Sequence, residues 1–455
     1  MHRSGLHYEY YLVASKNRGN RGGVSGLPDT MRHSKLWRNL VAALIITIVA
    51  GYLFSVWSTS NKATPTALSF AGNGGSCLTC HNQTTPGVVK QYGESKHAAN
   101  KVTCLDCHRG DPGDKLTVNH HDNNIVLRPT PQNCSRCHPA QTAQFDHSRH
   151  SAAAWYAQTG PSSFTAEQLT RYGLSAAGKY NDLYHIEDPA ITKMACEVCH
   201  SIGKPNADGT FGDCAKCHAG HTFSLAQVRK PEICGSCHLG PDHPMKEIYE
   251  ESIHGTIYAN KGAQWDWNAR VGTLSSKNFD APTCAICHMS SFGAASGTHD
   301  VGQRLSWALT PAQAEKRVDW ETKRLNMQTV CLECHAQKTI KTLYDNADKV
   351  VLKGNENIQT AQTIIKNLKD DGLIPAAPFS SSIDFKGFEI WHHEGRRMRF
   401  GAFMNGPDYV QWHGIYEQLI DLTELKEQDA SLRNTGVHTT ASTQDTSKST
   451  KIEGH

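Results

Sequence analysis

Large apolar side chains are scarce in this sequence. Only 38% of its 455 residues are hydrophobic and 8% are aromatic, which is low for a chain long enough to form two or three domains. A core built from these side chains alone would be small. An excess of charge is missing too, because 46 Lys and Arg residues face 43 Asp and Glu residues. This balance argues against nucleic acid as a partner.

The sequence also has no cysteine outside a single motif, C-x-x-C-H, which occurs eight times and uses all 16 cysteines. Disulfides or a zinc site would not explain why a histidine follows the second cysteine every time. The pattern is typical of covalently bound haem c, in which two thioethers anchor the porphyrin and the histidine is the proximal iron ligand. The eight expected sites are Cys77, Cys80 and His81; Cys104, Cys107 and His108; Cys134, Cys137 and His138; Cys196, Cys199 and His200; Cys214, Cys217 and His218; Cys234, Cys237 and His238; Cys284, Cys287 and His288; and Cys331, Cys334 and His335. Eight porphyrins would supply the missing core, and we expect no folding without them.

Long apolar runs are absent apart from Leu40–Trp57, which is preceded by several basic residues. The run is long for a signal peptide and lacks a clear A-x-A cleavage site, so we interpret 36–57 as a signal or, preferably, a transmembrane anchor. Residues 1–35 form an N-terminal extension, of which the first thirty are not translated if Met31 is the true start. Because haem c is attached outside the cytoplasm, we expect a periplasmic or other extracytoplasmic protein.

The remaining chain divides by composition. A linker at 58–72 precedes a multihaem body at 73–309 with the first seven motifs, whose intervals are rich in Gly, Pro, Asn and Asp. Residues 310–427 contain the eighth motif and show helical spacing of apolar residues. The polar segment 428–455 is expected to be disordered. The predicted fold is mainly α, with a loop-rich body, a C-terminal bundle of longer helices and very little β structure.

Eighteen of the 26 histidines lie outside the motifs. Haems that relay electrons usually carry two histidine ligands, whereas a haem that performs chemistry keeps one axial position open. An aromatic-x-x-Ser-x-His repeat ending at His97, His150 and His254 can supply three second ligands. The full set of candidates is His97, His120 or His121, His150, His221, His243, His254, His299 and one of the pair His392 and His393, of which we favour His393.

The eight motifs, the segments HTFSLAQVRKPEICGSCHLGPDHP and EIYEESIHGTIY, and the C-terminal WHHEGRRMRFGAFMNGPDYVQWHGIYEQL together resemble octahaem hydroxylamine oxidoreductases and their hydrazine-dehydrogenase relatives. The resemblance covers roughly residues 70–425. It implies a catalytic fourth haem, with His200 as its proximal ligand, and seven relay haems with two histidines each. It also implies a homotrimer.

The resemblance assigns further roles. A tyrosine from a neighbouring subunit is expected to bind the catalytic porphyrin covalently, and Tyr409 is the best match, with Tyr416 as a weaker substitute. An aspartate and a histidine are expected in the distal pocket, where Asp242, His243 and His254 are the candidates. Both histidines could equally be axial ligands of neighbouring haems.

The expected activity is oxidation of hydroxylamine or hydrazine at the fourth haem, with nitric oxide or nitrite as the product from hydroxylamine. Electrons would pass to a cytochrome c or to a quinone-linked membrane complex. Two alternatives remain open at this point: a reductive octahaem enzyme that forms ammonia from nitrite or hydroxylamine, and an electron conduit without catalysis. The sequence contains no C-x-x-C-K motif, which argues against a pentahaem nitrite reductase.

Overall fold

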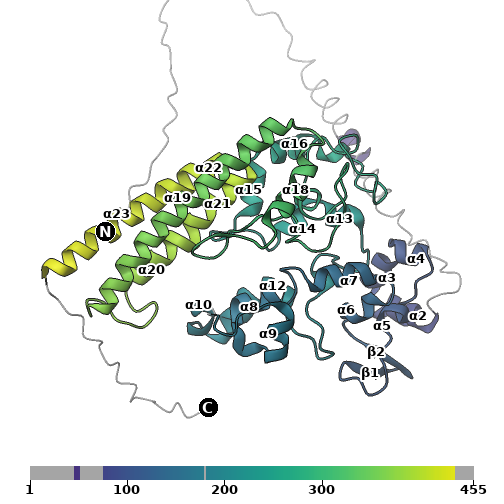
Figure 1. Ribbon diagram of the computed structural model, residues 1–455. Coiled ribbons are helices and arrows are strands. Elements are labelled where there is room, and N and C mark those ends of the chain that lie inside the picture. Colours follow the sequence, from purple (N-terminus) through teal and green to yellow (C-terminus); the bar gives the residue numbers. More distant parts are fainter. Residues whose placement is uncertain (1–45, 52–74, 179–180, 436–455) are drawn as a thin grey trace, which may run out of the picture. The chain divides into compact units, whose positions relative to one another are not determined.

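The computed structural model describes residues 46–51, 75–178 and 181–435 (Figure 1). The chain divides after Ser69 into two units, and of the first unit only the helical residues 46–51 are described. Within the described ranges, no helix is both long enough and apolar enough to cross a bilayer. The predicted anchor at 36–57 lies outside them except for those six residues. Everything below concerns the unit from Phe70 to His455.

The motifs up to the seventh lie among short helices joined by loops. The α-helices are α2 (Gly75–Thr84), α3 (Pro86–Gly93), α4 (Lys96–Ala99), α5 (Cys104–His108), α6 (Pro131–Ser135), α7 (Pro139–Asp146), α8 (Ala152–Thr159), α9 (Ala166–Tyr172), α10 (Asp182–Ile186), α11 (Pro189–Met194), α12 (Cys196–His200), α13 (Leu225–Arg229), α14 (Pro231–Gly235), α15 (Met245–Glu251), α16 (Ile253–Lys261) and α17 (Cys284–His288). The short 3-10 helices are η1 (Pro161–Ser163), η2 (Ser201–Gly203), η3 (Cys214–Lys216) and η4 (Gly262–Gln264). In α5, α12 and α17 the helix begins at the first cysteine and ends at the histidine. One helical turn therefore presents both sulfur atoms and the imidazole on the same face.

The aromatic-x-x-Ser-x-His repeat forms a tight turn at each occurrence. Ser95 and Ser252 cap the N-termini of α4 and α16, and each hydroxyl accepts a hydrogen bond from the backbone N–H three residues later, at 3.0 and 3.1 Å. Ser148 accepts from the backbone N–H of His150 at 3.1 Å. All three serines are buried. A buried serine that fixes the local backbone also fixes the position of the histidine two residues later.

The described residues contain two small antiparallel sheets. β1 (Thr117–His120) pairs with β2 (Asn123–Val126), and β3 (Trp307–Ala308) pairs with β4 (Glu315–Lys316). His121 and Asp122 connect β1 to β2 with φ of 47° and 62°, the left-handed conformation that a two-residue hairpin turn of type I′ requires. The predicted fold class, mainly α with very little β, is confirmed.

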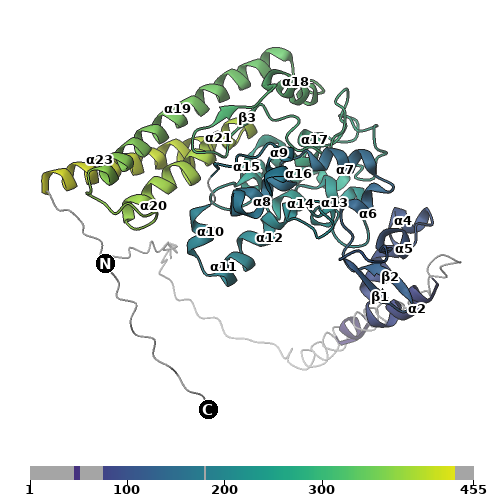
Figure 2. The same ribbon diagram turned by 60° about the horizontal axis from the view of Figure 1, so that its bottom comes forward.

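Longer helices form the C-terminal part, as the sequence predicts. They are α18 (Trp320–Cys331), α19 (Gln337–Asp370), α20 (Ser382–Phe388), α21 (Gly395–Met404), α22 (Pro407–Val410) and α23 (Glu417–Thr435), with two π-helical segments, η5 (Glu389–Glu394) and η6 (Gln411–Tyr416). α19 packs beside α21 and α23 in both views (Figures 1 and 2). Ile358, Leu368, Ile390 and Leu425 are fully buried between these helices. This apolar core is made by side chains of the longer C-terminal helices.

The two π-helical segments flank α21. π-helical turns are rare and occur mostly at functional sites, because the extra residue changes the direction of neighbouring side chains. At the other end of α21, a Cβ atom on Gly401 would lie 2.9 Å from the carbonyl oxygen of Gly406 and 3.0 Å from the nitrogen of Val410. Glycine is therefore needed where α21 turns into α22. The position of α21 matters because its first turn reaches the candidate site.

The predicted boundary between helices and polar tail falls inside α23, which continues to Thr435. Arg433 forms ion pairs with Asp371 and Asp429, both at 2.7 Å, and Leu432 packs against the apolar core. These contacts hold residues 428–435 in a helix, so the expected disorder from residue 428 onward does not apply to them. Residues 436–455 lie outside the described part of the chain.

Candidate haem sites and the pocket of the fourth motif

Six of the eight C-x-x-C-H histidines face a second histidine, with ring centroids 5.8 to 6.4 Å apart. Every second histidine is one of the candidates from the sequence, and at the first motif it is His120 rather than His121. The pairs are His81 with His120, His108 with His221, His138 with His97, His218 with His299, His238 with His150, and His335 with His254. The candidate His243 also lies 5.9 Å from His238, with the two rings edge-on.

The spacing of these pairs fits one iron atom between the two rings. A metal–nitrogen bond of about 2 Å on each side separates the centroids of two iron-bound imidazoles by roughly 6 Å. The tautomers fit as well. His108 Nδ1 donates to the carbonyl oxygen of Val126 at 2.8 Å, and His200 Nδ1 donates to that of Ala154 at 3.0 Å. A proton on Nδ1 leaves the lone pair of Nε2 for iron.

The cysteines of different motifs also meet, and their contacts show which motifs are neighbours. Hydrogen bonds or electrostatic interactions join Cys77 to Cys104, Cys107 to Cys134, Cys134 to Cys214, Cys217 to Cys234, Cys199 to Cys237, Cys234 to Cys284, and Cys287 to Cys331. The motifs therefore follow one another in space as first, second, third, fifth, sixth, seventh and eighth. The fourth motif branches from the sixth.

His200 of the fourth motif differs from the six paired histidines. No second imidazole faces it at the paired spacing in the described residues. Because its Nδ1 is the donor to Ala154, its Nε2 accepts, and the amide of Gln158 donates to it at 2.9 Å. Gln158 is buried on α8. Iron bound at this nitrogen would replace the hydrogen bond from Gln158. Nothing in the sequence pointed to Gln158.

Four polar residues, here called the Asp242 cluster, gather beside the fourth motif: Asp242 and His243 from the loop after the sixth motif, and His392 and Arg396 from η5 and α21. Asp242, His243 and Arg396 lie within electrostatic reach of His200, and His392 lies within reach of Asp242. Asp242 accepts a short hydrogen bond from His243 Nδ1 and lies 3.1 Å from Arg396 Nη1. His392 Nε2 lies 3.8 Å from Asp242 and 3.0 Å from Arg396 Nη1.

Electrostatics within the Asp242 cluster favour an ionised carboxylate. Burial would raise the pKa of Asp242, but the hydrogen bond from His243 and the charges of His243, His392 and Arg396 hold this pKa well below its usual value. Burial lowers the pKa of Arg396 to about 10, so the guanidinium stays charged at neutral pH. Burial lowers the pKa of His200 as well, and the charges of His243 and Arg396 add to this effect.

Two consecutive arginines at the start of α21 hold the loop after the sixth motif. Arg396 Nε donates to the carbonyl oxygen of Thr310, and Arg397 Nε donates to that of Pro241, both at 2.8 Å. Arg397 also pairs with Glu417 at 2.7 Å. The sequence contained a signal for these residues, since they follow His392 by one helical turn, but they had been assigned no role.

His288 of the seventh motif also has no second histidine at the paired spacing in the described residues. Its surroundings differ from those of His200. Burial and the nearby charge of Arg304 lower its pKa to about 4. Arg304 itself donates to four backbone carbonyl oxygens, of Ile286, Cys287, Ser290 and Ser296. This arginine stabilises the fold around the motif, because its terminal nitrogens donate to backbone carbonyl oxygens.

The remaining candidates lie elsewhere. His393 is hydrogen bonded to Glu389 and packs edge-on against Phe388, and no described C-x-x-C-H histidine faces it. Tyr409 is half-buried on α22, 5.3 Å from the ring of His413, whereas Tyr416 is exposed beside Trp412. Neither tyrosine contacts the described residues of the Asp242 cluster within this chain.

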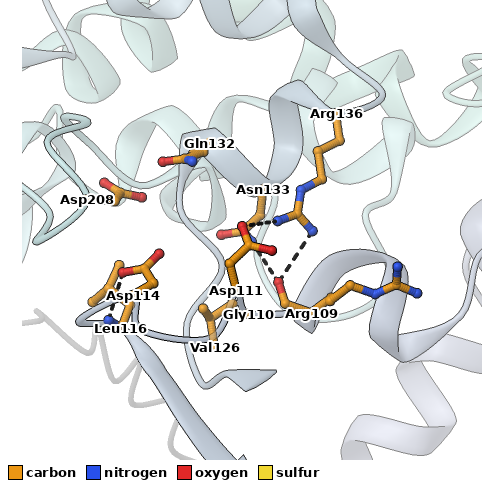
Figure 3. A pocket seen from close by; sticks show the side chains of 10 residues that line it. All are labelled: Arg109, Gly110, Asp111, Asp114, Leu116, Val126, Gln132, Asn133, Arg136 and Asp208. Atoms are coloured by element: carbon orange, nitrogen blue, oxygen red, sulfur yellow. Dashed lines mark hydrogen bonds and ion pairs between the residues drawn. The ribbon is translucent and has the colours of Figure 1, made fainter. Parts of the chain in front are cut away.

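A hollow beside the third motif is lined by polar side chains and contains neither histidine nor cysteine (Figure 3). Arg136 lies 3.8 Å from Asp111 and donates to the carbonyl oxygen of Arg109 at 3.3 Å. Its lining residues are Arg109, Gly110, Asp111, Asp114, Leu116, Val126, Gln132, Asn133, Arg136 and Asp208. The hollow borders the second histidine pair, because Val126 in its lining accepts the hydrogen bond from His108.

Known proteins with the same features were found in three comparisons. The family model described as "seven times multi-haem cytochrome CxxCH" matches residues 100–378, a range that contains the second to the eighth motif. A probable nitrite reductase-hydroxylamine oxidoreductase fusion protein of Kuenenia stuttgartiensis is 25% identical over 349 residues, or 66% of this chain. The chain spans only 38% of that protein's length.

Two solved structures share the fold. A hypothetical multihaem protein has a TM-score of 0.70 at 20% identity, with 79% of this chain and 95% of that chain covered. A reducing hydroxylamine-oxidoreductase-like protein complex of Kuenenia stuttgartiensis has a TM-score of 0.58 at 20% identity, with 79% and 85% covered. The family match, which spans more than half of the sequence, shows that this chain belongs to the multihaem cytochromes c with C-x-x-C-H motifs, and it confirms covalently bound haem c.

Proposed function

We propose that this chain binds eight haem c groups and oxidises hydroxylamine, or hydrazine, at the haem held by Cys196, Cys199 and His200. The observation that carries the proposal is the contrast between His200 and the six paired histidines. His200 has the Asp242 cluster nearby in place of a second imidazole. An oxidation that releases protons requires acid and base groups beside an iron with one open position.

When bound, haem supplies the electron acceptor for the substrate nitrogen and the conducting groups between motifs. The residues of this chain handle the protons. Because His243 Nδ1 faces Asp242, Nε2 is the ring nitrogen of His243 that is left to accept a proton from the substrate. The carboxylate then stabilises the imidazolium that forms, as in other Asp–His pairs. Nitric oxide, or nitrite after attack by water, is the proposed product from hydroxylamine.

The cysteine contacts support a route for electrons. Cys199 of the fourth motif meets Cys237 of the sixth, and contacts from the sixth motif continue through Cys217 toward the first motif and through Cys284 toward the eighth. Neighbouring attachment sites hold neighbouring porphyrin edges. We therefore propose that His150 and His238 would hold the haem of the sixth motif, and that this group would be the first to receive electrons from the fourth site.

A second candidate function is reduction of nitrite or hydroxylamine to ammonia at the same haem. The buried charge of Arg396 beside Asp242 favours it, because a cation attracts an anionic substrate. A conduit without catalysis is disfavoured, because it needs a second axial ligand on every iron and the structure pairs six of eight histidines.

Exposed apolar residues support assembly into a homotrimer. Trp412, Tyr416, Leu419 and Ile420 are exposed on η6 and α23, and their spacing of about one helical turn puts them on one face. An exposed apolar stripe of this kind marks a protein contact. Tyr409 directly precedes the stripe, so the same contact would bring it to the fourth haem of a neighbouring subunit, where we propose the covalent link.

The proposed setting is the periplasm or another extracytoplasmic compartment, with 36–57 as a membrane anchor and a cytochrome c or quinone-linked complex as electron acceptor. The relatives include a protein complex, which supports a redox partner.

If the anchor is retained, washing membranes with high salt will not release the mature protein and detergent will. Release without detergent would contradict it.

Hydroxylamine added to the oxidised, haem-loaded protein without oxygen is expected to reduce the low-spin haems and to yield nitric oxide or nitrite.

Replacing His243 by Gln removes the proton acceptor, and the reduction rate should fall about a hundredfold or more. His147→Gln changes an exposed histidine and serves as the control. Stopped-flow absorption gives both rates. Unchanged reduction in His243→Gln would refute the proton role, and nitrite-dependent oxidation of a reduced dye without hydroxylamine oxidation would favour the reductive function.

The histidine pairing makes a sharp prediction at the first motif, where two adjacent histidines are both exposed. His120→Ala should convert one low-spin haem to high spin, because His120 faces His81. His121→Ala should leave the spin states unchanged. Electron paramagnetic resonance of the oxidised proteins distinguishes them. The reverse pattern would assign the ligand to His121, and no change in either variant would disprove the pairing.

The proposed link to the fourth porphyrin makes a prediction about Tyr409. Tyr409→Phe should abolish the absorbance of a modified haem in the reduced protein, because no phenol oxygen remains to form the bond. Tyr416→Phe is the matched control and should keep the absorbance. A wild-type spectrum in Tyr409→Phe would remove Tyr409 from the site.

A further inference from the structure

Arg396 is held rigidly within electrostatic reach of His200. Its Nε donates to Thr310, and its Nη1 contacts both Asp242 and His392, at 3.1 and 3.0 Å. The side chain is only 14% exposed. Three contacts from two parts of the guanidinium fix its plane, so the direction of its remaining N–H groups is set before any ligand arrives.

The contact between Arg396 and Asp242 uses one nitrogen of the guanidinium. An arginine that serves only as an ion-pair partner commonly places both terminal nitrogens on the two carboxylate oxygens. Here the second oxygen of Asp242 is taken by His243. No group among the described residues accepts a hydrogen bond from Arg396 Nη2. Two N–H donors of a buried cation are therefore left for another acceptor.

The groups around the guanidinium define the charge that this acceptor carries. Asp242 is the one carboxylate of the cluster, and each of its oxygens has a donor of its own, His243 or Arg396. His392 meets the guanidinium through a ring nitrogen. With the carboxylate occupied in this way, an added small anion meets free N–H groups on a positively charged, planar donor.

We propose that Arg396 binds nitrite in the pocket beside His200, with the N–H groups of its Nη2 donating to the anion. This inference rests on the proposed function, because it names an anionic ligand of the same pocket. Nitrite is a small anion whose oxygens accept charge-assisted hydrogen bonds, and the two N–H groups of Nη2 are the donors that remain for it. Hydroxylamine is uncharged at neutral pH and gains no comparable attraction. Arg396 therefore favours nitrite over uncharged hydroxylamine.

Binding of nitrite to the oxidised, haem-loaded protein tests the proposal, measured by isothermal titration calorimetry and by the absorbance change. Arg396→Gln should raise the Kd for nitrite at least about tenfold, the effect of losing a charge-assisted hydrogen bond. Arg396→Lys keeps the charge but loses the planar pair of donors and should give an intermediate Kd. Arg433→Gln removes an exposed arginine that pairs with Asp371 and Asp429, and should bind nitrite like the wild type.

Only preparations with the full haem content are compared. Arg396→Gln with wild-type nitrite affinity would overturn the proposal, and so would a wild-type protein that does not bind nitrite. If Arg396→Gln does not take up haem, Arg396→Lys decides, since an unchanged Kd in that variant also overturns it. Reduction of the haems by hydroxylamine is followed in the same samples. Its absence, with Arg396-dependent nitrite binding intact, would refute hydroxylamine oxidation and leave the nitrite site standing.

Discussion

The structure depends on one constraint, which is that two sulfur atoms and one imidazole nitrogen must reach the same porphyrin. A single helical turn from cysteine to histidine meets this requirement, as α5, α12 and α17 show. So short an element needs few apolar side chains. This explains how a chain with 38% hydrophobic residues holds so many attachment sites.

The second histidine of a pair is positioned by the local backbone structure around it. Buried serines fix the turns before His97, His150 and His254, and a left-handed turn places His120 at the end of β1. These local structures bring together residues far apart in sequence, such as His254 and His335. Local order near each histidine thus determines a long-range contact that the haem completes.

The sequence predicted the motifs and the fold class because each depends on local chemistry, a fixed spacing or a composition. Six of the candidate second histidines face a histidine of a motif. It did not predict the spatial order of the motifs. Cys199 of the fourth motif lies beside Cys237 of the sixth, and Lys216 of the fifth motif donates to the carbonyl oxygen of Val198 in the fourth at 2.8 Å. Arg396 and Gln158 were missed as well, because their roles arise from contacts with residues more than forty positions away.

The C-terminal helices and the haem-binding part meet where Arg396 and Arg397 hold the loop that carries Asp242 and His243. One ion pair and one backbone contact thereby connect the side-chain core to the chemistry of the fourth site. The account's central claim is that the iron held by His200 lacks a second protein ligand. An electron cryomicroscopy map of the haem-loaded protein tests it most directly. We expect the distal side of that iron to face Asp242, His243 and Arg396 with no side chain bound to the metal, and a histidine bound there would contradict the account.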